Sequence, residues 1–363
     1  MSPPPRTTVA EEALPAAPPA RPRPATRRPV LEGPLTRGAG LAGATCLLGL
    51  CVLASLAYGS VEMSWGTVVA AFTAFDGSNE HIIVRELRVP RTLIGLGVGA
   101  ALALAGALMQ GVTRNPLAEP GVLGINAGAA LAVVLAIFLL GVTSAGAYVW
   151  FAFAGAAAAA VVVYALGSAG RDGATPVKLA LAGTVLAALL SSFTSAILVL
   201  DVDSLDQFRF WVVGSLAGRD MGVLVDVLPF LAVGIVIALA AGRALNAMSL
   251  GEDVARSLGQ RVALTRVVVA VAVVLLAGAS VAAAGPIAFV GLAVPHAVRI
   301  VVGTDWRWVL AYCAVAGPIL LLGADILGRV MVRPAELEVG IVTALVGGPV
   351  FIALARRRRL ASL

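Results

Sequence analysis

Lysine, cysteine and histidine are nearly absent from this sequence of 363 residues. The phosphate-binding loop G-x-x-x-x-G-K-[ST] requires a lysine, and the single lysine, Lys178, lies in the unrelated run ATPVKLAL, so the chain lacks this nucleotide-hydrolysis motif. The three cysteines and two histidines show no spacing typical of a zinc or haem site. We therefore expect no metal site and no cofactor, and any ATPase must be a separate polypeptide.

Charge is equally scarce. Charged residues make up 13% of the chain and hydrophobic residues 60%, with a mean hydropathy of +0.97. Soluble globular proteins have about 25% charged and about 45–50% apolar residues, so the composition excludes that class of protein. Long unbroken apolar runs exclude a membrane β-barrel, whose strands alternate apolar and polar residues. The sequence predicts an all-α membrane protein.

The apolar segments give the number of crossings. A transmembrane helix needs about 20 residues, so the chain has room for about ten. The run 121–170 is long enough for two spans that turn near 141–146, and the run 267–298 is expected to split at Gly285-Pro286. Similar Gly-Pro pairs at 317–318 and 348–349 are expected to interrupt two further segments. The remaining segments are 38–58, 92–112, 179–200, 221–241, 308–328 and 339–355.

The arginines predict the orientation. If the N-terminus is cytoplasmic and each segment crosses once, most cations fall on the cytoplasmic side, as the positive-inside rule requires. Both termini are then cytoplasmic: residues 1–37 form a disordered tail rich in Pro and Arg, and residues 359–363 form the other end. Orientation explains the net charge of +6, so no nucleic-acid partner is expected.

The apolar segments contain almost no ionisable residues. Asp226 and Asp325 lie near segment ends, and Asp325 precedes Arg329 by four residues, a spacing that favours an ion pair within one helix. A proton relay or an intramembrane active site would need such groups near the bilayer centre. Their scarcity disfavours an ion-coupled carrier, a channel or a membrane enzyme.

The segment 243–266 is the main polar loop. Ser249 followed by Glu252 reads as a capping box, and Gly259 as a helix terminator, so the spacing predicts a short helix over 251–258. Leu250, Val254 and Leu258 recur at every fourth position and form one apolar ridge. Such a ridge could enter a groove of a partner protein or rest on the chain's own membrane domain.

Several long strings resemble one known family. The run LRVPRTLIGLGVGAALALAGALMQGVTRNPLAEPGVLGINAGA (87–129) is similar to the FecCD family, the permease subunits of ATP-binding-cassette importers for ferric siderophores, haem and cobalamin. The resemblance covers residues 38–358. Further matching strings are LALAG (179–183), FWVVGSLAG (210–218), LNAMSLGEDVARSLG (245–259), AGPIAFVGLAVPHAVR (284–299), GADILGRVMVRPAELEVG (323–340) and TALVGGPVFIALA (343–355).

The resemblance implies three sets of functional residues. Arg88, Arg91 and Arg329 match outward-facing arginines that dock an extracytoplasmic binding protein; ordinary arginines at helix ends, snorkelling to the interface, are the alternative. Short helices over 245–260 match the seat of the ATPase. The matched ATPase-coupling residues are Leu250, Gly251, Glu252, Val254, Ala255, Leu258 and Gly259. The matched cytoplasmic gate residues are Asn115, Pro116 and Leu117.

Two positions depart from the family pattern. The loop that corresponds to the second half of the gate reads ATPVK (174–178), where some members have small polar residues, and Glu338 replaces the proline of an ELP motif. These departures lie in the second half of the gate and at the start of the last span.

The resemblance implies a permease subunit, not an enzyme, that translocates ferric siderophore across the bacterial cytoplasmic membrane by alternating access. Cobalamin or haem import is the first alternative, and an ion-coupled carrier or channel the second. The expected partners are cytoplasmic ATP-binding subunits, a substrate-binding protein, a second permease subunit (identical or paralogous) and membrane lipid.

Overall fold

The structure is a computed structural model, and it describes residues 29–142, 144–169 and 175–356. Every regular element in these ranges is a helix. Seven helices or helix pairs are long and apolar enough to cross a membrane, and three shorter apolar helices, Ile125–Leu140, Val290–Val302 and Val339–Pro349, bring the number to the predicted ten. The all-α membrane architecture is confirmed.

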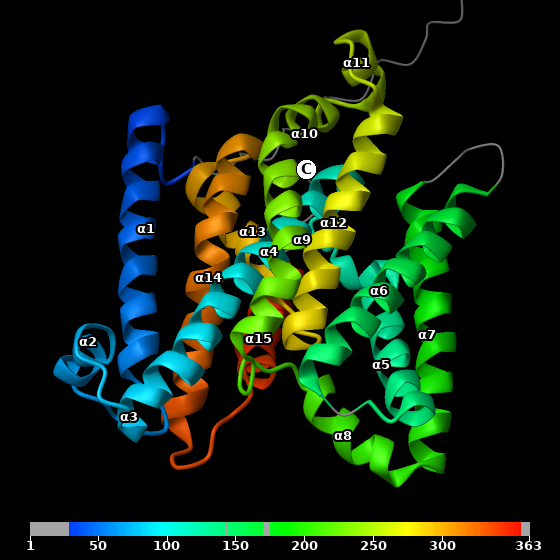
Figure 1. The fold of residues 1–363 in the computed structure, drawn as a ribbon. Coiled ribbons are helices and arrows are strands. Elements are labelled where there is room, and N and C mark those ends of the chain that lie inside the picture. The colour runs from blue at the N-terminus through cyan, green and yellow to red at the C-terminus, as the bar shows by residue number, and fades with distance from the viewer. Residues whose placement is uncertain (1–28, 143, 170–174, 357–363) are drawn as a thin grey trace, which may run out of the picture.

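The first half of the chain builds the centre and both flanks of the bundle, with α1 at one edge and α7 at the other (Figure 1). Its helices are α1 (Pro34–Ala57), α2 (Trp65–Thr73), α3 (Asn79–Ile82), η1 (Ile83–Arg88), α4 (Val89–Thr113), η2 (Pro120–Leu123), α5 (Ile125–Leu140), α6 (Ala145–Ser168) and α7 (Pro176–Leu200). The turn between α5 and α6 falls where glycines predicted it, since Gly141 ends α5 in the left-handed conformation at φ +62°.

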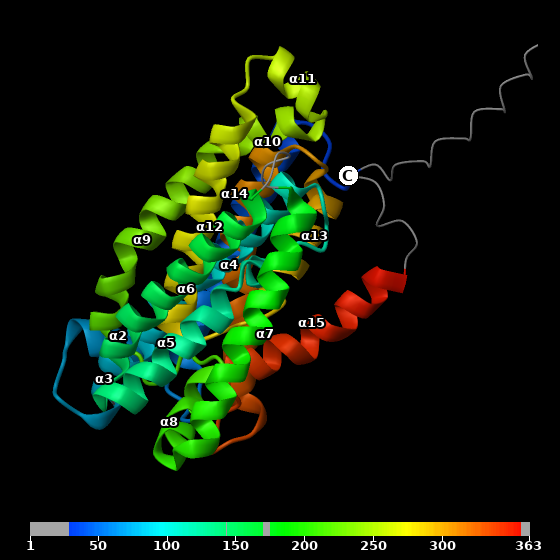
Figure 2. The same cartoon turned by 90° about the vertical axis from the view of Figure 1, so that its right-hand side faces the viewer.

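The second half adds the remaining spans and the connecting helices. They are α8 (Val202–Val212), α9 (Met221–Ala240), α10 (Gly242–Ser249), α11 (Glu252–Ser257), α12 (Val262–Ala284), α13 (Val290–Val302), α14 (Trp306–Met331) and α15 (Val339–Arg356). Helices α2, α3 and α8 gather at one end of the bundle, called here the α8 end, and α10 and α11 at the opposite end, the α11 end (Figures 1 and 2).

Helix α4 is the central element of the bundle. It packs against α14, α12 and α13, and 83% of the best apolar window in its span is buried. Gly99 allows this close approach, because an added Cβ would lie 2.7 Å from the Pro318 Cα of α14. Gly95 meets Leu322 of the same helix. Small residues in this segment therefore let the helix backbones come close.

Of the three Gly-Pro pairs, only the first interrupts a helix. Gly285 ends α12 with φ +72°, and α13 begins at Val290. Pro318 and Pro349 lie inside α14 and α15, which continue through them, so the predicted interruptions at these two positions were wrong. Neighbouring helices can accommodate a proline in a membrane helix without a break.

The predicted tail is shorter than expected. Pro34 occupies the first turn of α1, a position that suits proline, so the helix begins inside the segment 1–37. Leu31 also donates a backbone hydrogen bond to the Val301 carbonyl at 2.9 Å. The expectation of disorder over residues 29–37 was therefore wrong; residues 1–28 and 359–363 lie outside the described residues.

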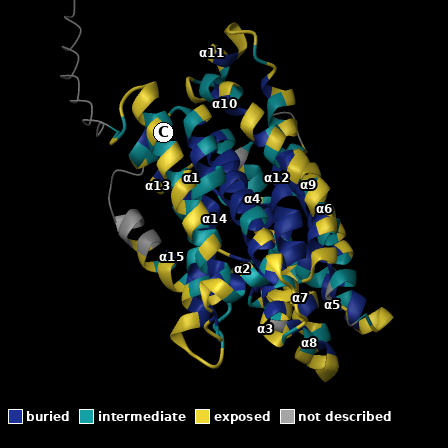
Figure 3. Cartoon of the chain, turned by 60° about the vertical axis from the view of Figure 1, so that its left-hand side comes forward, coloured by how far each residue is buried: buried dark blue, intermediate teal, exposed yellow. Residues whose placement is uncertain are grey.

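The outer helices keep apolar faces exposed (Figure 3). Only 6% of the apolar window of α1 and 11% of that of α7 is buried. Along α7, exposed apolar side chains recur every fourth residue, and this set is called here the α7 stripe. The stripe consists of Val177, Leu181, Val185, Leu189 and Phe193.

Candidate functional site

The three arginines predicted to dock a binding protein come together at the α8 end, but their side chains are buried. Arg88, Arg91 and Arg329 are 5%, 9% and 2% exposed. Arg88 ends η1, Arg91 lies in the first turn of α4, and Arg329 lies near the end of α14, which packs against α4. The sequence placed them correctly at one end of the bundle and did not reveal their burial.

Arg88 satisfies its guanidinium on backbone carbonyls. It donates to the carbonyl oxygens of Leu56 and Ala57, both at 2.7 Å, and to that of Val61. Leu56 and Ala57 belong to the last turn of α1, whose final carbonyls have no partner within the helix. Arg88, the last residue of η1, thus caps α1 and fixes it to the start of α4.

Arg91 and Arg329 share the carboxylate of Asp325, which is fully buried. Their guanidinium nitrogens lie 2.8 Å and 3.0 Å from its oxygens, so the predicted ion pair between Asp325 and Arg329 is confirmed. Arg91 also contacts Glu336 at 2.7 Å, and Arg329 donates to the Ser55 hydroxyl at 2.9 Å. Burial alone would raise the pKa of the Glu336 carboxyl, but its hydrogen bond with Arg91 brings the pKa below the usual value.

The gate segment follows the last turn of α4. Arg114 ends the helix in the left-handed conformation at φ +50°, and the Asn115 side chain accepts a hydrogen bond from the Leu117 backbone N–H at 3.0 Å. This arrangement is an Asx turn. Leu117 is exposed, and the gate role of Asn115, Pro116 and Leu117 stays a prediction. The second gate segment, 174–178, lies partly outside the described residues.

Glu119 is a residue near the gate that the sequence did not single out. It lies between the gate segment and η2, outside the spans. Burial raises the pKa of its carboxyl, and a backbone hydrogen bond from Phe289 opposes this only in part. Phe289 belongs to the break between α12 and α13, so Glu119 connects the gate segment with that break.

The predicted coupling helix forms as α11, and its apolar ridge faces away from the bundle. Leu250, Val254 and Leu258 are 64%, 44% and 63% exposed. The described part of the chain therefore does not cover the ridge, which excludes the alternative that it rests on its own membrane domain. On the opposite face, Ala255 is buried against Met248 and Val262.

The capping of α11 differs from the prediction. Gly251, at φ +110°, is the N-cap and no side chain caps the helix. Ser249 instead closes the last turn of α10 by donating to the Asn246 carbonyl at 2.7 Å, so the predicted capping box was wrong. The Glu252 carboxylate does not take the capping role, because it pairs with arginines instead. Gly259 ends the segment at φ +82°, as predicted.

Glu252 is the centre of an ion cluster that the sequence did not reveal. Its carboxylate contacts Arg256 of α11 at 3.3 Å, Arg114 at the end of α4 at 3.6 Å, and Arg266 of α12. We call Arg114, Glu252, Arg256 and Arg266 the Glu252 cluster. It joins the short helix directly to the residue that precedes the gate segment.

Asn246 anchors the other short helix, α10. Its side chain donates to Asp305 at 2.7 Å and accepts from the Trp306 backbone N–H at 2.8 Å. Asp305 is the N-cap of α14, and Arg307 also pairs with it at 2.9 Å. Hydrogen bonds from Arg307 are the largest cause that lowers the pKa of the Asp305 carboxyl to about 2. Helix α10 is thus fixed to α14, and α11 projects beyond it.

Nothing in the described ranges suggests a metal centre, because no three His, Cys, Asp or Glu side chains come together there. The site instead consists of two polar ends, the buried arginines at the α8 end and the exposed ridge at the α11 end, on either side of an apolar bundle.

Comparison with known families decides the assignment. The profile of the FecCD transport family matches residues 47–357. The chain belongs to the FecCD transport family. FecCD chains are permease subunits of ATP-binding-cassette importers, in which a separate ATPase hydrolyses ATP. Together with the apolar helices, FecCD membership makes this chain a multi-pass membrane protein.

Two relatives show how similar this FecCD chain is to named permeases. It is 49% identical to the "Probable siderophore transport system permease protein YfiZ" of Bacillus subtilis over 84% of its own length and 92% of the relative. It is 48% identical to the ferric enterobactin transport system permease protein FepD of Escherichia coli, covering 87% and 94%.

A solved structure agrees with the FecCD fold. It is an ATP-binding-cassette transporter of the metal-chelate type in an inward-facing conformation, and it superposes with a TM-score of 0.76 at 29% identity. The match covers 88% of this chain and 99% of that chain.

Proposed function

We propose that this FecCD chain is the permease subunit of an importer that carries a ferric siderophore across the bacterial cytoplasmic membrane. The exposed ridge of Leu250, Val254 and Leu258 carries the proposal, because a water-facing apolar ridge on a short helix needs a partner to cover it. The named siderophore permeases that it resembles support the choice of cargo. The chain supplies the pathway, and an ATPase partner supplies the energy.

The ATPase would seat on α11 at the cytoplasmic side. Arg114, Arg243, Arg256, Arg261 and Arg266 all lie at the α11 end, and an excess of arginine is typical of cytoplasmic loops. Because Glu252 contacts Arg114, movement of α11 would reach the gate segment at Asn115, Pro116 and Leu117 through one carboxylate. Alternating access would then follow as a rigid-body change between two packings of the helices.

The binding protein would dock at the α8 end. Arg88, Arg91 and Arg329 hold the outer ends of α1, α4 and α14 together, so we propose that they shape the docking surface and that their charge attracts acidic partner residues. Charge reversal at Arg88 should weaken association most strongly at low salt; unchanged affinity in a correctly folded variant would leave these arginines a purely structural role.

The second permease subunit would cover the α7 stripe. Helices α7 and α15 lie near each other at the edge of the molecule in Figure 2, and no described helix covers the stripe on α7. A cysteine introduced at Val185 should give a disulfide-linked permease dimer in membranes; a purely monomeric product would contradict the interface.

Cargo is tested by uptake in cells that lack their own siderophore permeases. Cells that express this chain with its ATPase and binding protein should accumulate radioactive iron supplied as a ferric siderophore. Uptake of cobalamin or haem instead of iron would favour the first alternative. A variant with Leu250→Asp serves as the control for background uptake.

A further inference from the structure

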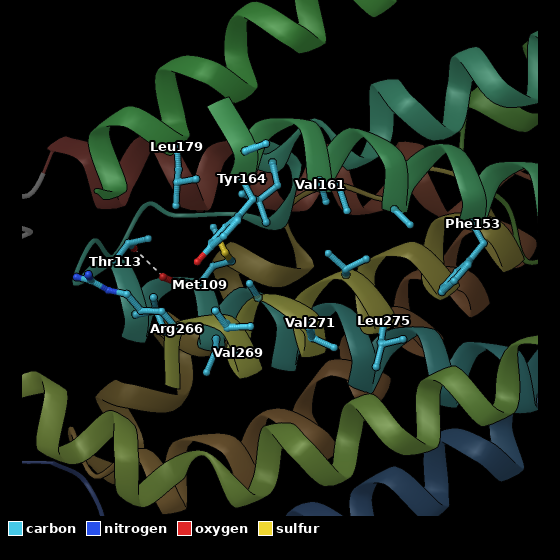
Figure 4. Close-up of a pocket in the computed structure, with 18 residues that line it drawn as sticks. Met109, Thr113, Phe153, Val161, Tyr164, Leu179, Arg266, Val269, Val271 and Leu275 are labelled. Carbon is cyan, nitrogen blue, oxygen red and sulfur yellow. Dashed lines mark hydrogen bonds between the residues drawn. The ribbon is translucent and has the colours of Figure 1, made fainter. Parts of the chain in front are cut away.

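An apolar crevice of about 450 Å³ opens between α4, α6, α7 and α12 (Figure 4). Leu123 of η2 closes one wall, and the other lining side chains are nearly all aliphatic or aromatic. The polar exceptions are Thr113, Tyr164 and Arg266, and the Thr113 hydroxyl is already bonded to the Met109 carbonyl. An oxygen-rich iron chelate would find almost no hydrogen-bond partners in this crevice, so it is unsuited to the proposed cargo.

The length of the crevice corresponds to one leaflet of a bilayer. Arg266 and Thr113 lie at one end, and Phe153 and Leu275 at the other (Figure 4). Arg266 and Leu275 are nine residues apart on α12, or about 14 Å at the helical rise. Half of a hydrocarbon core of about 30 Å is nearly the same length. The crevice therefore runs from the interface at the α11 end to the middle of the membrane.

The end at the interface is positively charged. The stem of Arg266 lines the crevice while its guanidinium reaches out to the Glu252 cluster, the snorkelling arrangement of an arginine at a membrane surface. Arg114 follows Thr113 directly, and Arg261 begins α12. With Arg256, four arginines stand against the two acids of this region, Glu252 and Asp253, so positive charge is in excess.

We propose that this crevice binds one acyl chain of an anionic phospholipid, with the lipid phosphate at Arg266 and Arg114. The apolar lining suits the acyl chain, and the one-leaflet length of the crevice suits a lipid whose headgroup lies at the interface. The excess of arginine at that end suits an anionic headgroup. Basic sites between membrane helices on the cytoplasmic side are suited to such headgroups. The phosphate and the Glu252 carboxylate would then share the same two guanidinium groups.

Native mass spectrometry of the purified full-length chain tests the proposal without any transport partner, so its failure is distinguishable from failure of the import function. The probes are phosphatidylglycerol, phosphatidylcholine and inorganic phosphate. One phosphatidylglycerol should remain bound at a lipid concentration at least about fivefold lower than phosphatidylcholine requires, the factor expected for one basic residue near an anionic group. Equal retention of the two lipids, or retention of phosphate alone, would overturn it.

Variants separate the two parts of the site. Ala157→Phe fills the crevice from α6 and should abolish retention, whereas Val236→Phe, on an exposed face of α9 outside the crevice, should leave it unchanged. Arg266→Gln should remove the preference for phosphatidylglycerol and keep weak binding of both lipids. Ala270→Leu, from the α12 wall, repeats the filling test if Ala157→Phe lowers the melting temperature. A folded filling variant that still retains the lipid would refute the assignment.

Discussion

At the scale of residues, the buried carboxylate of Asp325 pairs with two arginines at the α8 end, and Glu336 supplies a second negative charge to Arg91. Arg91 reaches it from α4 and Arg329 from its own helix, and Ser55 of α1 completes the contacts of Arg329. Positive charge of this kind is tolerated inside a bundle only when it is paired and hydrogen-bonded. The cluster therefore joins α14 to α1 and α4, whose contacting residues lie 274 and 234 positions earlier in the sequence.

Replacing Asp325 should destabilise the permease more than replacing any surface acid. Asp325→Asn leaves the buried Arg329 guanidinium without a counter-charge and Arg91 with Glu336 alone, and breaking a buried pair in this way costs about 3–5 kcal/mol. The free energy of unfolding in detergent, measured by denaturant titration, checks this. Asp206→Asn is the control, because Asp206 forms an exposed pair with Arg209, worth about 0–1 kcal/mol. Equal losses in the two variants would contradict the central role of Asp325.

The free energy of unfolding should depend on pH through the carboxyl group of Asp305. Its folded pKa of about 2 lies below the unfolded value of about 3.9, so its contribution is complete above about pH 4 and is lost as the pH falls through 2. Asp305→Asn should lower stability at neutral pH and flatten the loss between pH 4 and 2. Thermal melts across that range measure it, and an unchanged acid profile would show that the carboxylate does not hold α10 to α14.

At the scale of elements, the sequence predicted that α11 is a helix, but it did not predict which contacts hold this helix in place. The four-residue spacing of the ridge and the glycine at its end were sufficient to predict the helix and its apolar ridge, but only the structure shows that the ridge is exposed. Local spacing could not reveal that Glu252 turns away from Ser249, because its partners Arg114 and Arg266 come from other helices. The same limit applies to Arg88, Arg91 and Arg329: the family motifs predicted their end of the bundle, and only tertiary packing shows their burial.

Glu252→Gln should separate ATP hydrolysis from transport. The ridge remains exposed, so the ATPase should still bind and hydrolyse ATP, but the link from α11 to Arg114 is lost. Cargo moved per ATP should fall at least about fivefold, the lower end of typical coupling between sites. Asp253→Asn on the same helix is the matched control, since the Asp253 side chain is 99% exposed and pairs only with Arg256 among the described residues. A similar loss in both variants would contradict a specific role of Glu252.

At the scale of the whole molecule, the distribution of charge fits a chain that forms the pathway while a separate ATPase hydrolyses ATP. The ten apolar helices and the breaks near 141–146 and 285–286 follow from hydropathy and glycine alone, because lipid requires every span to satisfy its backbone internally. The sequence did not reveal that the helices continue through Pro318 and Pro349, because packing of neighbouring helices decides whether a proline breaks a membrane helix. The spans lack the midplane charges of an ion-driven carrier, and charge collects at the two ends, where partners would bind.

The source of energy is therefore the central claim, and uptake into sealed vesicles tests it most directly. Vesicles that contain this permease with its second subunit, ATPase and binding protein should accumulate ferric siderophore only when ATP is supplied on the α11 side. Leu250→Asp should abolish that uptake, because a charge in the ridge prevents seating of the ATPase. Accumulation by the permease without any ATPase, driven by a proton or sodium gradient, would contradict the account.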